Sequence, residues 1–256
     1  MTNLNDKNIM LFGGVDIGHY NYRNFENNHF NKNLWRFEYD SVTPGNSKWL
    51  RYDNKILANK SILPDSVTEG TDSVFVNGKF HMFGGSHSLS HMILNKSLAF
   101  TNQFFEFNHN KNQWTQKDPS IEPSIDKEEK SRVPPDTRAY HKMVPLFEND
   151  ISDAKQFVLF GGINLEEGDF YPSVEDNCTW IYDSSAGKDS WLRLPVHESD
   201  PDGRYLHNMA PIGGNRAVMI GGCTPNICEF SECHLNSENN LIDLSCLLYT
   251  SPSPRD

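Results

Sequence analysis

The sequence predicts an all-β protein built from repeated units of short antiparallel strands, and three observations carry this prediction. An apolar run that ends in Gly-Gly occurs four times along the 256 residues. After each of the first three runs comes an aromatic-rich segment and then a single Trp. The composition, with 17 Gly, 14 Pro and 12% aromatic residues, suits many short strands joined by turns.

The Gly-Gly runs are expected to form the second strand of each unit. They read IMLFGG, FHMFGG, FVLFGG and AVMIGG, and they end at Gly13 and Gly14, Gly84 and Gly85, Gly161 and Gly162, and Gly221 and Gly222. Glycine at the end of a strand permits a positive φ and a close approach of neighbouring backbone, where a Cβ atom would clash. The pairs therefore predict positions at which adjacent units crowd together.

The aromatic-rich segments are expected to form the third strands, and the Trp residues to lie in the fourth. The segments are 34–40, 103–110 and 179–183, and the Trp residues are Trp49, Trp114 and Trp191. A sheet of four short strands cannot bury both of its faces alone. We expect the aromatic side chains to fill the gap between neighbouring sheets.

A second repeat precedes the third and fourth Gly-Gly runs. Arg138 and His141 recur as Arg204 and His207, each pair followed by Met and Pro in register. The second unit has Glu-Gly-Thr-Asp at 69–72 instead. The Arg and His side chains could serve acid/base catalysis, but their recurrence at a repeat position favours a structural hydrogen-bonding role.

Together these residues resemble the kelch repeat, which belongs to the superfamily of the galactose oxidase central domain. The resemblance covers roughly residue 9 to the mid-230s. It implies a β-propeller, in which four-stranded sheets pack as blades around an axis and so protect their edges. The units exceed the ~50 residues usual for kelch, which predicts inserted loops.

The expected fold is accordingly a partial kelch propeller of roughly three to four blades. The first unit is expected to lack its first strand, because Met1 stands just before IMLFGG. That strand would come from further sequence on either side. The fourth unit is expected to end after about three strands.

The last eleven residues, 246–256, read CLLYTSPSPRD and resemble the translation of a sequencing adapter. We therefore assign 1–245 to the propeller fragment and set 246–256 aside as read-through. A natural Ser/Pro-rich tail is the alternative.

The long loops are expected to share one face. Strand direction alternates within a blade, so the loops between strands two and three and the connections between blades emerge together. Long loops on a rigid scaffold tend to carry function. The first loop offers residue types that are common at interface hot spots, although some of its aromatics could instead cover the propeller edge. These candidate partner-binding residues are Tyr20, Tyr22, Arg23, Phe25, His29 and Phe30.

Charge and chemistry restrict the functional classes. The formal net charge of -11 argues against a nucleic-acid or anionic-membrane partner. No apolar run approaches the roughly 20 residues of a membrane span, and we expect a cytoplasmic protein. Cys223, Cys228, Cys233 and His234 could form a zinc cluster, but their spacing departs from the usual pattern and plain thiols are the simpler interpretation.

The favoured function is a non-enzymatic scaffold or adaptor that binds another protein through the loop face and needs no cofactor. This step rests on analogy of fold. One alternative is an enzyme, either a copper protein like galactose oxidase or a propeller without a cofactor, with its catalytic residues in further blades. Another is an extracellular recognition domain, for which the glycosylation sequons at Asn59, Asn95 and Asn177 would be relevant.

Overall fold

The computed structural model describes residues 2–5, 8–13, 33–52, 64, 70–85, 100–117, 134–164, 173–174, 177–185, 190–224 and 247–249. Within these ranges the protein is all-β, and its only helical segments are the short 3₁₀ turns η3 (Pro44–Asn46) and η5 (Ile151–Asp153). In the same ranges, no helix is long and apolar enough to span a membrane.

The first two blades are four-stranded antiparallel sheets whose strands pair in chain order. Blade 1 contains β1 (Thr2–Asn5), β2 (Asn8–Phe12), β3 (Leu34–Glu38) and β4 (Lys48–Arg51). Blade 2 contains β5 (Asp72–Val76), β6 (Lys79–Phe83), β7 (Phe104–Asn108) and β8 (Gln113–Lys117).

The last two blades continue this pattern. Blade 3 contains β9 (Lys142–Leu146), β10 (Gln156–Phe160), β13 (Thr179–Asp183) and β14 (Ser190–Arg193), and the pair β11 (Ile163–Asn164) and β12 (Ser173–Val174) extends from it. Blade 4 has three strands, β15 (Asn208–Gly213), β16 (Arg216–Ile220) and β17 (Leu247–Tyr249).

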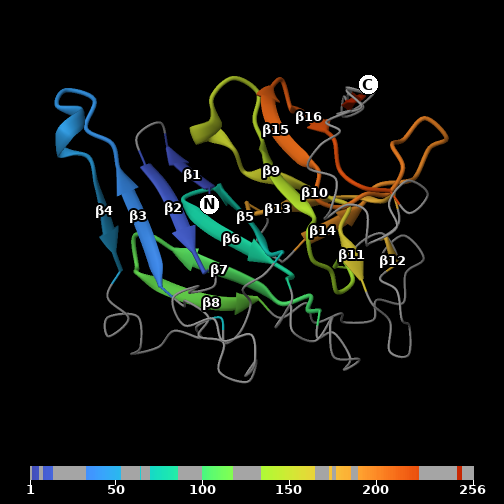
Figure 1. Cartoon of the computed structure of the whole chain (residues 1–256), viewed down its shortest axis with the longest axis horizontal. Coiled ribbons are helices and arrows are strands. Elements are labelled where there is room, and N and C mark those ends of the chain that lie inside the picture. The colour runs from blue at the N-terminus through green and yellow to red at the C-terminus, as the bar shows by residue number, and fades with distance from the viewer. Residues whose placement is uncertain are drawn as a thin grey trace, which may run out of the picture.

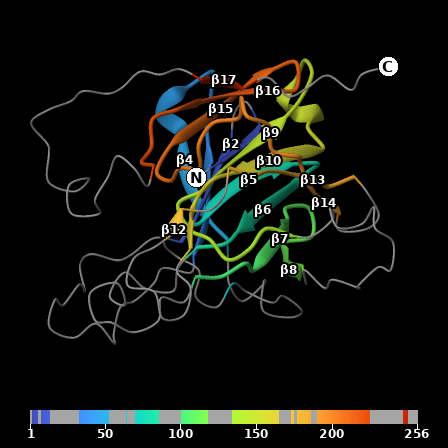
Figure 2. The same ribbon diagram turned by 90° about the vertical axis from the view of Figure 1, so that its right-hand side faces the viewer.

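The blades are arranged as an arc, which is the architecture of a partial propeller (Figures 1 and 2). The first strands are the inner ones, and contacts between neighbouring blades run from β1 to β5, from β5 to β9 and from β9 to β15. An inner strand is also a sheet edge. Pro145 and Pro211 are therefore tolerated in β9 and β15. A proline has no N–H to donate, and a strand that is paired on one side only does not need that donor on its free side.

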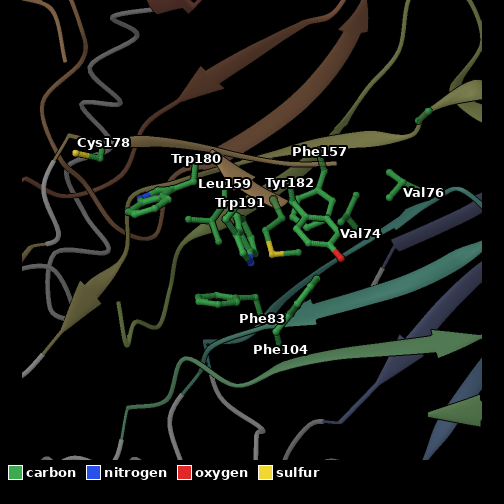
Figure 3. Packing of buried hydrophobic residues seen from close by; sticks show 12 residues of the cluster. Val74, Val76, Phe83, Phe104, Phe157, Leu159, Cys178, Trp180, Tyr182 and Trp191 are labelled. Carbon is green, nitrogen blue, oxygen red and sulfur yellow. The ribbon is translucent and has the colours of Figure 1, made fainter. Parts of the chain in front are cut away.

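The hydrophobic cores lie between blades and not within one blade. Figure 3 shows the core between blades 2 and 3, where Phe83 and Phe104 face Phe157, Tyr182 and Trp191. A second core joins blades 1 and 2 around Met10 and Trp114, and a smaller one joins blades 3 and 4 around Val158 and Ala217. Each blade is thus buried only by its neighbours.

One expectation about the strands was wrong. The first unit does not lack its first strand, because β1 pairs with β2 with Thr2 opposite Met10. The sequence of β1 is TNLN, which has no apolar pattern, and pairing to β2 uses main-chain groups alone.

The third strand of blade 4 lies in the segment that resembles an adapter. β17 pairs with β16 with Leu248 opposite Val218. An exposed strand edge accepts another extended segment through main-chain hydrogen bonds and requires little of its side chains. Strand pairing therefore carries no information about the origin of 246–256.

Candidate functional site on the loop face

The strand register places one end of every blade on the same face of the arc. In blade 2, Phe83 at the end of the Gly-Gly run pairs with Asp72 on one side and with Phe104 on the other. Phe160 pairs in the same way with Lys142 and Thr179. We call this end the loop face. It contains the Gly-Gly pairs, the starts of the inner strands and the ends of the loops between strands two and three.

On the loop face, the second and third Gly-Gly pairs are in contact with the Arg-x-x-His segments of blades 3 and 4. The Gly85 amide donates a hydrogen bond to the Arg138 carbonyl at 2.7 Å, and the Gly162 amide donates to the Arg204 carbonyl at 2.9 Å. A Cβ atom added to Gly84 or Gly161 would collide with the same two carbonyl oxygens. These glycines have φ of +63° and +71°. Close backbone packing between blades explains why glycine stands there.

The arginine side chains connect the segment back to their own blade. Arg138 donates from Nε to the Asp136 carbonyl and from Nη1 to the Gly161 carbonyl, both at 3.1 Å. Arg204 makes the equivalent bonds to Asp202 and Gly221, both at 3.2 Å. The two arginines are thus held by the same contacts in consecutive blades.

Blade 2, which lacks the Arg and His pair, satisfies the equivalent carbonyl differently. Thr71 Oγ1 donates to the Gly84 carbonyl at 3.1 Å. Thr71 occupies the place of His141, since the next residues, Asp72 and Lys142, hold the same register position. A short hydroxyl therefore replaces the long guanidinium as the donor to this carbonyl.

The two histidines are buried at the joints between blades. His141 packs edge-on against Phe83 and His207 against Phe160, with ring centroids 5.7 and 5.8 Å apart. Burial lowers the pKa of His207 to about 3, and the positive charge of Arg204 adds to the effect. Burial, followed by the charge of Arg138, holds the pKa of His141 well below its ordinary value. Both imidazoles are neutral at pH 7 and shielded from solvent.

Three equivalent residues form an inner rim on the loop face. Gly70, Tyr140 and Leu206 each stand two positions before the first residue of their inner strand, and their φ angles are +66°, +60° and +57°. The Tyr140 amide donates to the Gly70 carbonyl at 2.7 Å, and the Leu206 amide donates to the Tyr140 carbonyl at 3.1 Å. A chain of main-chain hydrogen bonds thus links three consecutive blades around the axis.

A cleft of about 320 Å³ runs along the inner strands, between blade 1 and blade 4. Its end at the loop face is polar, with Asp72, Lys142 and Asn208 as the first residues of β5, β9 and β15. Lys142 Nζ lies 3.7 Å from Asp72 Oδ1, and the Met143 amide donates to Asp72 Oδ2 at 2.7 Å. Burial raises the pKa of Asp72, and the Lys142 charge opposes that rise. The rest of the cleft is mainly apolar, including Phe75 and Met209.

The remaining predicted site residues lie partly outside the described part of the chain. The candidate loop residues Tyr20, Tyr22, Arg23, Phe25, His29 and Phe30 lie outside the described residues, as do Gly14, Cys228, Cys233 and His234. Gly13, at φ +79°, directly follows β2. Trp114 and Trp191 are buried between blades, but Trp49 is 44% exposed.

Within the described ranges, no group of three or more His, Cys, Asp or Glu side chains is placed to hold a metal ion. Of the predicted thiols, Cys223 lies at an isolated bridge to Tyr205 next to the last Gly-Gly pair.

Sequence reasoning missed the rim and the polar end of the cleft. The available signal was the alignment of Thr71-Asp72 with His141-Lys142 and His207-Asn208, which places Gly70, Tyr140 and Leu206 at one position. Their side chains have no chemical property in common, so the equivalence of the three residues is recognised only from their shared left-handed backbone conformation.

The sequence matches no protein-family model and no curated protein. Among solved structures, the chain is similar to that of YjhT, with 17% identity and a TM-score of 0.52. The alignment covers 85% of this chain and 56% of that one, so the chain spans just over half of the length of YjhT. At this identity the likeness shows the fold alone.

Proposed function

We propose that the protein is a kelch-type propeller that acts as a non-enzymatic scaffold and binds another protein through its loop face. The recurring contact between Gly-Gly and Arg-x-x-His supports the kelch assignment. The net charge of -11 supports a protein partner over nucleic acid or an anionic membrane. The cytoplasmic location is part of the same proposal.

The observation that carries the proposal is the conformation of Tyr140 and Leu206. Both adopt the left-handed region at a position where blade 2 has Gly70. Left-handed backbone costs a non-glycine residue of order 1–3 kcal/mol, and such residues are common at functional sites. Leu206 is also 53% exposed, so its side chain gains little from burial within the chain. Contact with a partner would account for apolar side chains at strained positions.

The cleft also supports binding of a partner at the loop face. Its polar end is formed by the first residues of β5, β9 and β15, two positions after the rim residues, and protein interfaces commonly combine an apolar centre with polar groups around it. The partner would meet Leu206 and Tyr140 at the rim and the Asp72–Lys142 pair behind it.

The test is the double variant Tyr140→Gly, Leu206→Gly. Glycine keeps the main-chain hydrogen bonds and removes the backbone strain, so we expect unchanged or higher thermal stability. The immobilised variant should nevertheless lose proteins that the wild-type chain retains from an extract of its source cells, as measured by quantitative mass spectrometry.

The matched control is Val42→Gly, which removes a 90% exposed apolar side chain from the β3–β4 hairpin at the opposite face. This variant should retain the same proteins as the wild type. Equal retention by the rim variant, or no specific retention by the wild type, would contradict the proposal.

A further inference from the structure

Both internal joints around blade 2 are built in the same way. The residue before Gly-Gly in one blade contacts the Trp of the next blade's fourth strand. Phe12 of blade 1 lies 5.2 Å from Trp114 of blade 2, and Phe83 of blade 2 lies 5.4 Å from Trp191 of blade 3, measured between ring centroids. Each joint therefore has a leading face with the Trp and a receiving face with the residue before Gly-Gly.

The leading faces of blades 2 and 3 are buried, and that of blade 1 is not. The register makes five positions equivalent in the three blades. In blade 2 they are Phe80, Met82, Phe105, Phe107 and Trp114, none more than 3% exposed. In blade 3 they are Phe157, Leu159, Trp180, Tyr182 and Trp191, none more than 4% exposed. In blade 1 they are Ile9, Leu11, Trp35, Phe37 and Trp49, of which the first four are half-buried and Trp49 is 44% exposed.

The receiving face of blade 4 is the other open end. Ile220 is 36% exposed and Ile212 is 46% exposed, whereas Phe160, the equivalent of Ile220 in blade 3, is 3% exposed. Ala210 and Val218 complete this apolar face. A Cβ atom added to Gly221 would meet no described atom within 4 Å, although Gly84 and Gly161 are each covered by the next blade.

In the part of the chain that the structure describes, the arc therefore ends in the two complementary halves of its own internal joint. We propose that the receiving face of blade 4 binds the leading face of blade 1 in a second copy of the chain, head to tail. Trp49 of one copy would lie against Ile220 of the other, as Trp114 lies against Phe12.

The joint between blades 1 and 2 shows that such a contact does not require the Arg and His pair. Blade 2 carries Glu-Gly-Thr-Asp at 69–72, yet Trp114 is 1% exposed against blade 1. Blade 1 of a second copy can thus dock through its apolar face alone. A head-to-tail contact is heterologous, so it closes into a ring where the rotation permits and otherwise extends.

The experiment measures molar mass by light scattering at increasing protein concentration, up to ~100 µM, where a micromolar contact is largely formed. The wild-type chain should exceed its monomer mass of 29.3 kDa. Trp49→Lys and Ile220→Lys each place a charge in the joint and should each weaken association roughly tenfold or more.

Mixing the two variants distinguishes this arrangement from other modes of association. Trp49→Lys keeps an intact receiving face, and Ile220→Lys keeps an intact leading face. Each variant alone should associate more weakly than the wild type at the same concentration, and an equimolar mixture should form a dimer through the single intact joint. Ile212→Lys should behave as Ile220→Lys does, and Val42→Lys, on neither face, should associate as the wild type.

Three results would overturn the proposal. A wild-type chain that remains monomeric would show that the end faces do not bind each other and would leave blades of other sequence as their occupants. Association of either single variant as strong as that of the wild type would place the contact elsewhere. A mixture that stays monomeric while circular dichroism shows both variants folded would exclude the pairing of these two faces.

Discussion

At the residue scale, the same position repeats in successive blades with different side chains, and its environment decides what that side chain does. His141 and His207 illustrate this point, since both are buried against an aromatic ring and near an arginine. Removing a histidine from water disfavours its charged form, and the neighbouring guanidinium adds repulsion. These residues hold blades together only as long as they stay neutral.

The histidines should make stability depend on pH. The folded-state pKa of His207 is about 3, below the ordinary value of 6.5, so this contribution is fully present above pH 6.5 and is lost as the pH falls toward 3. As the pH falls through that window, His207 should lower the free energy of unfolding by about 1 kcal/mol per pH unit. Urea unfolding between pH 7.5 and 4.5 measures the slope.

The variant His207→Phe keeps the ring contact with Phe160 but cannot be protonated. It should lose stability less steeply below pH 6.5 than the wild type. A slope equal to that of the wild type would show that His207 is already accessible to protons in the folded state.

Substitutions at two glycines distinguish the energetic cost of backbone strain from the cost of disturbing the contact between blades. Gly161 and Gly221 have similar φ, +71° and +69°, but only Gly161 faces a carbonyl of the next blade. Gly221→Ala should therefore cost only the left-handed strain, about 1–2 kcal/mol. Gly161→Ala should cost several kcal/mol, because the Arg204 carbonyl must also move. Urea unfolding of dilute protein measures both, and equal losses would contradict the role assigned to the close approach.

At the scale of the strand, the blades share one architecture, but the side chain that donates to the equivalent main-chain carbonyl is not the same in every blade. The carbonyl at the first glycine of the last three Gly-Gly pairs accepts from Thr71 in blade 2 and from Arg138 and Arg204 in blades 3 and 4. A buried carbonyl without a donor is costly, so each unit needs some donor but not a particular one. This requirement explains how the second unit tolerates the loss of its Arg and His.

Thr71 should consequently contribute through its hydroxyl. Thr71→Val removes the donor at nearly constant shape and should lower the free energy of unfolding by about 1–2 kcal/mol. Thr71→Ser keeps the hydroxyl and should recover most of that loss. The urea midpoints of the three proteins measure the effect, and a Val variant as stable as the wild type would show that another donor satisfies Gly84.

At the scale of the whole molecule, the cores between blades make stability a sum over neighbours. No blade buries both of its faces alone, so removing one blade exposes the face of the next. The leading face of blade 1 and the receiving face of blade 4 have no such neighbour among the described residues, and they are the faces that are half-exposed. The proposed head-to-tail contact would bury both of them with residues of the kind that already pack inside the arc.

The sequence by itself determined the all-β class, the four units and the strands that end in Gly-Gly, because these depend on local periodicity and on repetition along one chain. It also marked Arg138, His141, Arg204 and His207 as repeat positions. The partner-binding loop at Tyr20 to Phe30, the kelch assignment and the separate origin of 246–256 remain predictions.

Only the tertiary structure decided which neighbours these positions meet. The link of Gly70, Tyr140 and Leu206 around the axis, the replacement of arginine by Thr71, and the exposure of Trp49 beside the burial of Trp114 and Trp191 all involve residues far apart in sequence. A repeat pattern assigns equal roles to equivalent residues. Packing distinguishes them, because Trp114 and Trp191 lie against a preceding blade and Trp49 has no such neighbour among the described residues.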